Sequence, residues 1–132
     1  MHGQSKRIAL VTGANKGIGL EVARCLGKAG LIVLLGARNA GLGQAATTAL
    51  KAEAADARYI ELDVVRPATI EAAAATIGAE FQRLDVLVNN AGINDPGDGP
   101  PGTVDLSAVR RVMETNFFGT LAVTQAMLES GR

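Results

Sequence analysis

The sequence is poor in several residue types that carry chemistry: it has one cysteine, one histidine, one tyrosine and no tryptophan in 132 residues. A single cysteine excludes a disulfide within the chain and argues against metal ligation. Because Cys25 falls at an apolar position of an expected helix, we predict that its side chain is buried as a small hydrophobic group. No apolar run approaches the roughly 18 residues of a membrane-spanning helix.

The charge pattern lacks an excess of either sign, because 13 basic and 13 acidic side chains cancel. No stretch concentrates one sign, so we expect neither a nucleic-acid partner nor a membrane-surface partner. The first residues, Met1 to Lys6, form a short polar segment. We therefore expect a cytoplasmic protein whose partner is a small molecule.

The hydrophobic residues, 48% of the chain, are dominated by alanine, valine, leucine and isoleucine, which is typical of an α/β domain. Short apolar runs alternate with segments that have helical spacing or high helix propensity. The expected strands span residues 7–11, 31–35, 58–62 and 85–88. The order β-α-β-α-β-α-β-α predicts a doubly wound parallel sheet with right-handed crossovers and helices on both faces.

Four helices are expected between and after these strands. The first ends at Gly30, which accepts a left-handed conformation, the second spans about residues 41–55, and the third begins at Pro67. The last is expected to be one continuous helix over about residues 105–127. Two predicted apolar stripes are Ile18, Val22, Leu26 and Ala29 in the first helix, and Val109, Met113, Phe117, Thr120 and Val123 in the last.

A glycine-rich turn runs from Thr12 to Gly19, between the first strand and the first helix. In that context, glycines let the backbone approach a diphosphate, and the following helix N-terminus attracts the anion. The turn therefore predicts a site for the pyrophosphate of a nicotinamide dinucleotide. The alternative is that the glycines only make a tight strand-to-helix connection. A phosphate loop of the nucleoside-triphosphatase type does not fit, because no Gly-Lys-Ser/Thr follows.

The end of the second strand indicates which dinucleotide is bound. An acid there would accept hydrogen bonds from the adenosine ribose of NAD, but the sequence reads Gly36-Ala37-Arg38. Arg38 and Lys16 could together clasp a 2′-phosphate, which an acid would repel. The sequence thus favours NADP(H) over NAD. The alternative is that both cations are ordinary solvated side chains.

Polar residues at the end of the fourth strand fall where a doubly wound sheet binds its ligands. The segment Asn89 to Gly92 should lie beside the first strand, where the direction of winding reverses. Either asparagine could instead satisfy backbone groups at the strand end. Asn116 lies in the apolar part of the last helix, and its spacing favours a structural role.

Four motifs together resemble the N-terminal half of a short-chain dehydrogenase/reductase of the carbonyl reductase-like kind. They are collinear from Arg7 to about Met127, and they are Thr12 to Gly19, Asp63-Val64, Asn89-Asn90-Ala91-Gly92, and Thr115-Asn116-Phe117-Phe118-Gly119. The resemblance implies a Rossmann fold with strand order 3-2-1-4, and a reaction that moves hydride between NADP(H) and a carbonyl or alcohol.

The resemblance also implies the role of individual residues. The glycine turn, Lys16 and Arg38 would hold NADP(H), Asp63 and Val64 would flank its adenine, and Asn90 would line the site. Asn116 would bend the last helix and support a water-linked proton relay to the family's active-site lysine. The cofactor-binding residues so implied are Gly13, Asn15, Lys16, Gly17, Ile18, Gly19, Arg38, Asp63, Val64, Asn90, Ala91 and Gly92.

The resemblance implies that the reaction needs a serine on the next strand and a Tyr-x-x-x-Lys pair on the following helix. Ser5, Ser107 and Ser130 do not occupy such a position, Tyr59 is the sole tyrosine, and Asp63 stands four residues after it. We therefore expect residues 1–132 to be a cofactor-binding domain, incomplete at the C-terminus and without turnover of its own. Residues 86–88 should lie on an unpaired sheet edge and promote self-association. The alternatives are a catalytically dead module that binds NADP(H) or pairs with another subunit, and a non-functional gene fragment.

Overall fold

Runs rich in valine, leucine and isoleucine form the strands of a parallel sheet, and the alanine-rich segments between them form helices. The computed structural model describes residues 6–91 and 106–130, apart from the side chains of residues 108, 109, 112, 116, 117, 129 and 130. The strands are β1 (Ile8–Thr12), β2 (Ile32–Ala37), β3 (Asp56–Glu61) and β4 (Val86–Val88). The helices are α1 (Gly17–Lys28), α2 (Ala40–Ala52), α3 (Pro67–Glu80), α4 (Leu106–Met113), the π-helical segment η1 (Glu114–Gly119) and α5 (Thr120–Ser130).

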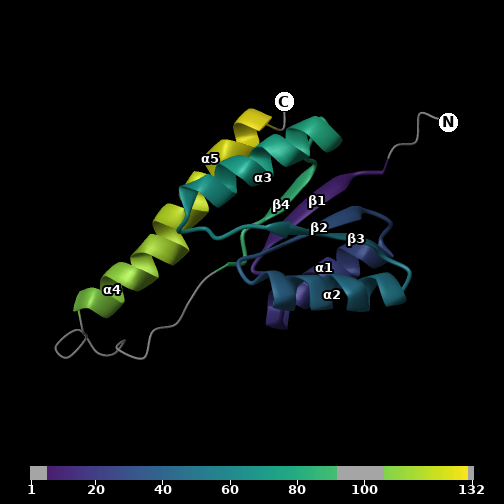
Figure 1. Ribbon diagram of the computed structural model, residues 1–132, viewed down its shortest axis with the longest axis horizontal. Coiled ribbons are helices and arrows are strands. Elements are labelled where there is room, and N and C mark those ends of the chain that lie inside the picture. The colour runs from purple at the N-terminus through teal and green to yellow at the C-terminus, as the bar shows by residue number, and fades with distance from the viewer. Residues whose placement is uncertain (1–5, 92–105, 131–132) are drawn as a thin grey trace.

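The sheet has the predicted strand order, β3-β2-β1-β4, with every pair parallel. Helices α1 and α2 cover one face, and α3 and α5 cover the other (Figure 1). Strand β1 lies between β2 and β4 and is buried along its whole length. Its alternate side chains serve two cores, because Leu10 packs with α3 and α5 whereas Val11 packs with α1 and α2. The doubly wound architecture is thus confirmed.

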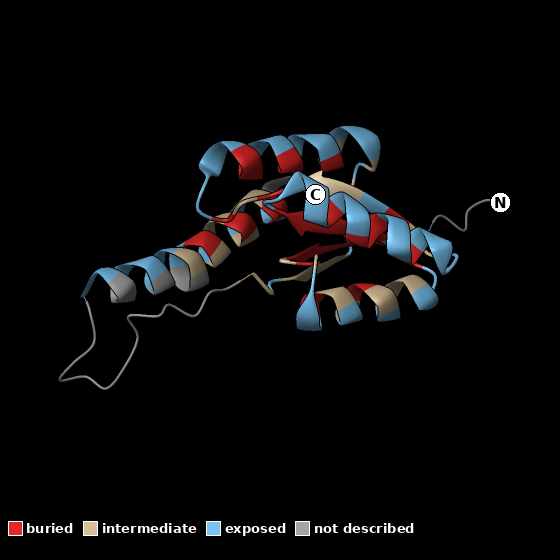
Figure 2. Ribbon diagram, turned by 60° about the horizontal axis from the view of Figure 1, so that its bottom comes forward, coloured by how far each residue is buried: buried red, intermediate tan, exposed pale blue. Residues whose placement is uncertain are grey.

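The strand register brings the carboxyl ends of the strands to one edge of the sheet. Thr12 at the end of β1 pairs with Gly36, Ala37 at the end of β2 pairs with Glu61, and Val11 pairs with Val88. The buried residues concentrate in the sheet and on the inner sides of the helices (Figure 2). The loops that leave this edge are therefore the ones that can form a site.

Helix α1 packs on the sheet through its smallest residues, which was not predicted. Gly19 and Ala23 are buried, and a Cβ added at Gly27 would lie 2.8 Å from the Cβ of Ala55. A close approach of helix and sheet requires small side chains on the inner face. The bulkier Val22 and Leu26 of the predicted stripe are partly buried and pack against the same core. The side chain of Ile18 is 77% exposed and Cys25 is exposed, so the prediction that Cys25 is buried was wrong.

The last helix is not continuous, because η1 inserts a π-helical segment between α4 and α5. A π-helical turn contains more residues than an α-helical one, so it rotates the side chains that follow it relative to those before it. The expected single apolar stripe is broken accordingly: Met113 is 44% exposed, whereas Val123 and Met127 are buried in the core beside α3. Asp105, the expected first residue, lies outside the described residues.

Gly119 explains how η1 reaches the sheet edge. A Cβ added at this position would lie 2.6 Å from the backbone oxygen of Val64, in the loop after β3. The glycine therefore lets the π-helical segment touch that loop. Within residues 6–91 and 106–130, no helix is both long enough and apolar enough to cross a membrane.

Candidate functional site

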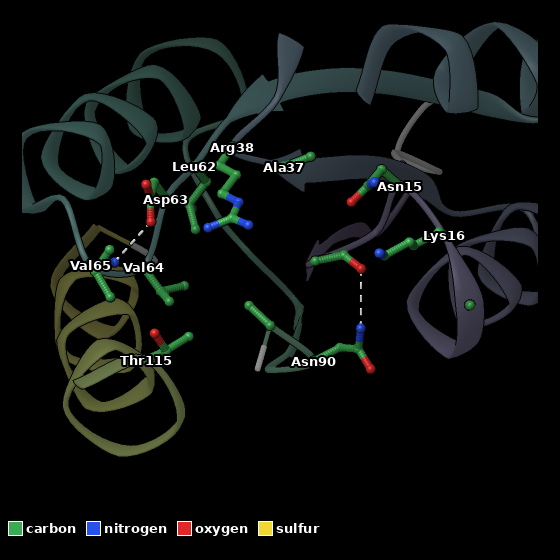
Figure 3. Close-up of a pocket in the computed structure, with 13 residues that line it drawn as sticks. Asn15, Lys16, Ala37, Arg38, Leu62, Asp63, Val64, Val65, Asn90 and Thr115 are labelled. Atoms are coloured by element: carbon green, nitrogen blue, oxygen red, sulfur yellow. Dashed lines mark hydrogen bonds between the residues drawn. The ribbon is translucent and has the colours of Figure 1, made fainter. Parts of the chain in front are cut away.

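A cavity of about 500 Å³ lies at the carboxyl edge of the sheet (Figure 3). The loops after all four described strands contribute to its wall, and η1 adds one residue. The lining residues are Gly13, Asn15, Lys16, Gly17, Ala37, Arg38, Leu62, Asp63, Val64, Val65, Asn90, Ala91 and Thr115. The cavity therefore occupies the position where open α/β sheets bind ligands.

The glycine turn forms the part of the cavity wall between β1 and α1. Gly13 and Gly17 have φ angles of +61° and +60°, which side chains rarely tolerate. A Cβ at Gly13 would lie 2.9 Å from the Cα of Ala91, and one at Gly19 would overlap the Asn90 side-chain amide. The glycines thus allow the tight turn and let the loop after β4 lie directly against it. Helix α1 begins at Gly17 without a side-chain cap or an acid in its first turn, so its positive end favours an anion.

The buried hydroxyl of Thr12 joins the turns that follow β1 and β4. The backbone N–H groups of Asn90 and Ala91 both donate to Thr12 Oγ1, each at 2.9 Å. The side-chain amide of Asn90 donates in turn to the backbone oxygen of Gly13 at 3.1 Å (Figure 3). Asn90 therefore satisfies a backbone group and lines the cavity at the same time.

Asn89 has a purely structural contact. Its side-chain amide donates to Thr124 Oγ1 at 3.1 Å, and that hydroxyl donates to the backbone oxygen of Thr120. The contact ties the end of β4 to α5. Asn89 does not line the cavity, which supports the interpretation of this asparagine as a strand-end residue.

Two cations extend into the cavity from separate elements (Figure 3). Lys16 precedes α1, and Arg38 follows β2. Both are exposed, and neither forms an ion pair with any acid in the part of the chain that the structure describes. Their positive charges are therefore available to an anionic ligand.

The opposite wall is made by the loop after β3. Asp63 Oδ1 accepts a hydrogen bond from the backbone N–H of Val65 at 3.1 Å, and the backbone N–H of Asp63 donates to Thr69 Oγ1 at 2.9 Å. These bonds hold Val64, which is 6% exposed, against the cavity. The loop thus offers an apolar surface beside a fixed carboxylate, which suits a purine ring and its amino group.

The structure brings nine of the twelve predicted cofactor-binding residues together around the cavity; the other three, and the predicted relay residue Asn116, are not among its described lining residues. Ile18 faces outward and borders a separate apolar hollow on α1, and Gly19 is buried behind the turn. Gly92 lies outside the described residues, and Asn116 lies in η1 with a side chain outside the described part. Four lining residues that were not predicted are each adjacent to a predicted residue or its motif: Ala37, Leu62, Val65 and Thr115.

The sole tyrosine is engaged in the scaffold. The hydroxyl of Tyr59 donates to the backbone oxygen of Ala37 at 2.9 Å, and Tyr59 does not line the cavity. Burial, and to a lesser extent the nearby carboxylate of Glu61, raises the pKa of the Tyr59 phenol above its ordinary value. Among the described residues, no three histidine, cysteine, aspartate or glutamate side chains gather to hold a metal ion.

A family model described as short chain dehydrogenase matches residues 7–130. Carbonyl reductase (NADPH) 1 of Mus musculus is 42% identical over 126 residues, which are 94% of this chain and 44% of that protein. Short-chain dehydrogenase/reductase 1 of Saponaria officinalis is 39% identical over 132 residues, 42% of its length. The chain thus spans about half the length of the curated relatives it matches.

Solved structures that resemble this chain also extend over about twice its length. A crystal structure of an actinorhodin polyketide ketoreductase variant with NADPH superposes with a TM-score of 0.88 at 39% identity, over 99% of this chain and 49% of that one. A gluconate 5-dehydrogenase of Burkholderia cenocepacia, in complex with NADP and tartrate, gives a TM-score of 0.85 at 32% identity, over 93% of this chain and 48% of that one. Both neighbours therefore share the fold and have about twice the chain length.

Replacing Thr12 by valine should lower the free energy of unfolding by about 1–3 kcal/mol, because two partly buried N–H groups lose their acceptor without a change of shape. The replacement Thr12→Ser is the matched control, since it keeps the hydroxyl. Urea unfolding followed by circular dichroism measures both variants. If the valine variant is as stable as the serine variant, the Thr12 hydroxyl does not hold the two turns.

Proposed function

The chain belongs to the short-chain dehydrogenase family, and from this premise we propose that it binds NADP(H) in the cavity at the carboxyl edge of its sheet. It would supply the cofactor-binding part of an oxidoreductase that moves hydride between NADP(H) and a carbonyl or alcohol. The observation that carries the proposal is a pair of cations, Lys16 and Arg38, which form no ion pair among the described residues and lie beside a glycine turn. The NADPH and NADP in the neighbours' structures agree with it.

The diphosphate of the cofactor would lie on the glycine turn. The backbone of Gly13 to Gly17 borders the cavity, and no Cβ at Gly13 or Gly17 obstructs an approaching phosphate. The positive end of α1 would stabilise the two negative charges. The residues of this turn therefore act mainly through their backbone.

The adenosine end would lie between the cations and the loop after β3. Arg38 can present two parallel donors to a 2′-phosphate, and Lys16 can add a point charge. Asp63 and Val64 line the cavity wall on the side where an adenine ring would then lie. The absence of an acid at the end of β2 removes the partner that the ribose of NAD would need.

We propose that the 132-residue chain binds cofactor without turning over a substrate. The family's Tyr-x-x-x-Lys pair is not in this sequence, and Tyr59 already donates its proton to a backbone carbonyl. Asn116 would keep the family's helix-bending role, which agrees with its place in the π-helical segment. Chemistry would then require a proton donor from outside these residues.

A second candidate function is a module that pairs with another subunit. Among the described strands, β4 pairs only with β1, and all three of its residues are partly exposed. Such an edge presents backbone donors and acceptors to another strand. A second copy of the chain is the occupant we propose for this edge.

The replacement Arg38→Asp should weaken NADP(H) binding by about 10- to 100-fold and strengthen NAD(H) binding, because the new carboxylate repels a 2′-phosphate and accepts from a ribose hydroxyl. Fluorescence titration of NADPH and NADH measures both affinities. Lys51→Asp is the matched control, since it makes the same charge change at the far end of α2. Unchanged NADPH affinity in the Arg38 variant would refute the assignment.

The purified chain should reduce no carbonyl compound with NADPH above the level of a Gly17→Val control. That control strains the turn at its positive φ and should remove cofactor binding. The missing general acid alone is worth about 10²- to 10⁴-fold in rate. Turnover measured by NADPH oxidation, in protein free of host reductase and absent from the control, would show that the chain is an enzyme by itself.

Self-association should increase with protein concentration, because the edge of β4 can pair with the same edge of a second copy. Sedimentation velocity over the range in which the chain is soluble measures the distribution of species. A single monomeric species throughout would contradict this candidate function and leave cofactor binding unaffected.

A further inference from the structure

The guanidinium of Arg38 can recognise a phosphate only if the backbone that carries it is held in place. Arg38 is the first residue after β2, is exposed, and forms no ion pair with an acid of the described residues. Its position therefore depends on its two neighbours in the chain. Each neighbour is held by two hydrogen bonds, one of which involves a side chain.

The residue before Arg38 is fixed by a pair of donors. The backbone oxygen of Ala37 accepts from the hydroxyl of Tyr59 at 2.9 Å and from the backbone N–H of Leu62 at 3.1 Å. That oxygen belongs to the same planar peptide unit as the nitrogen of Arg38. Two hydrogen bonds, from Tyr59 in β3 and from Leu62 just after it, therefore fix the orientation of the peptide that joins Ala37 to Arg38.

The residue after Arg38 is fixed by the start of α2. Asn39 Oδ1 accepts from the backbone N–H of Leu42 at 2.9 Å, and its backbone oxygen accepts from the N–H of Gly43 at 2.8 Å. The helix N-cap therefore anchors Arg38 from the other side. The Tyr59 hydroxyl and the Asn39 cap thus hold the residues immediately before and after Arg38.

The chain makes room for the tyrosine ring at one position. A Cβ added at Gly43 would overlap Cε1 and Cδ1 of Tyr59, so the glycine in α2 is what admits the ring. A phenylalanine would pack against this glycine equally well, and Leu62 already satisfies the Ala37 oxygen. The hydroxyl is therefore required by neither packing nor hydrogen-bond satisfaction. With the phenol pKa raised by burial and by Glu61, the group remains a donor at neutral pH.

We propose that Tyr59 is a positioning residue for cofactor specificity: its hydroxyl holds the Ala37–Arg38 peptide so that Arg38 meets the 2′-phosphate of NADP(H). The inference rests on the proposed function and deepens it. Tyr59 does not line the cavity, so it would act through Arg38 and not by touching the cofactor.

The test is a double-mutant cycle in the full 132-residue chain, with Tyr59→Phe, Arg38→Met and the two combined. Fluorescence titration gives the dissociation constants of NADPH and NADH for each protein, and circular dichroism gives its melting temperature. Thr47→Val is the matched control, because it removes a buried α2 hydroxyl that bonds only to the backbone oxygen of Gly43.

Tyr59→Phe should weaken NADPH binding by about 3- to 10-fold and leave NADH binding unchanged, the loss expected for one hydrogen bond. In the Arg38→Met background it should have no further effect on NADPH. Thr47→Val should leave the ratio of the two affinities at its wild-type value. If Tyr59 had a merely structural role, Tyr59→Phe would weaken the binding of NADPH and NADH alike, and this effect would also appear in the Arg38→Met background.

Two failures can be told apart. In the first, the wild-type chain prefers NADPH, but Tyr59→Phe keeps that preference or lowers NADPH affinity equally in the Arg38→Met background. Either result overturns the role of Tyr59 only. A wild-type chain that shows no preference for NADPH overturns the proposed function, and the role of Tyr59 with it.

Discussion

The candidate site depends on one buried hydroxyl, that of Thr12, which is 1% exposed. It accepts from two consecutive backbone N–H groups in the turn after β4, while Asn90 in that turn donates to Gly13 beside Thr12. On the other side, the N–H of Ala14 donates to the backbone oxygen of Gly36 in β2. The glycine turn is thus bonded to both neighbouring strands, which a flexible glycine loop needs if it is to present a defined anion site.

The sheet and most of the cavity wall follow from the sequence because their signals are local. Strands buried on both faces are continuous apolar runs, and the sheet edge that carries the site follows from the β-α alternation. Glycines at a strand-to-helix turn, together with Arg38 where an acid would serve NAD, mark the cavity from two sides. Ala37, Leu62, Val65 and Thr115 carry no such signal, since each lies at the site only because of the position of its neighbour.

The failed predictions share a different cause. Hydrophobic periodicity predicts which face of a helix is the most apolar. In α1, however, the buried residues are the small Gly19 and Ala23, and Cys25 is exposed. The π-helical segment is equally invisible to spacing, because one inserted residue leaves both flanking segments helical in pattern. Its cause is a contact distant in sequence, the approach of Gly119 to the loop at Val64. Both features are decided by close packing between elements, which composition does not report.

Tyr59 links the proposed cofactor specificity of the site with the proposal that the chain does not turn over a substrate by itself. A proton donor for carbonyl reduction must stand beside the reacting carbon, whereas the Tyr59 hydroxyl donates to Ala37 from beneath α2, where Gly43 admits its ring. Withdrawing the tyrosine from this bond would free a phenol but would leave the peptide that precedes Arg38 with the bond from the Leu62 N–H alone of the two described. Because a single hydroxyl proton cannot serve both partners, the hydroxyl of Tyr59 as placed in this structure is engaged with the backbone at the end of β2. Under the proposed function, the proton for hydride chemistry would come from a group other than Tyr59.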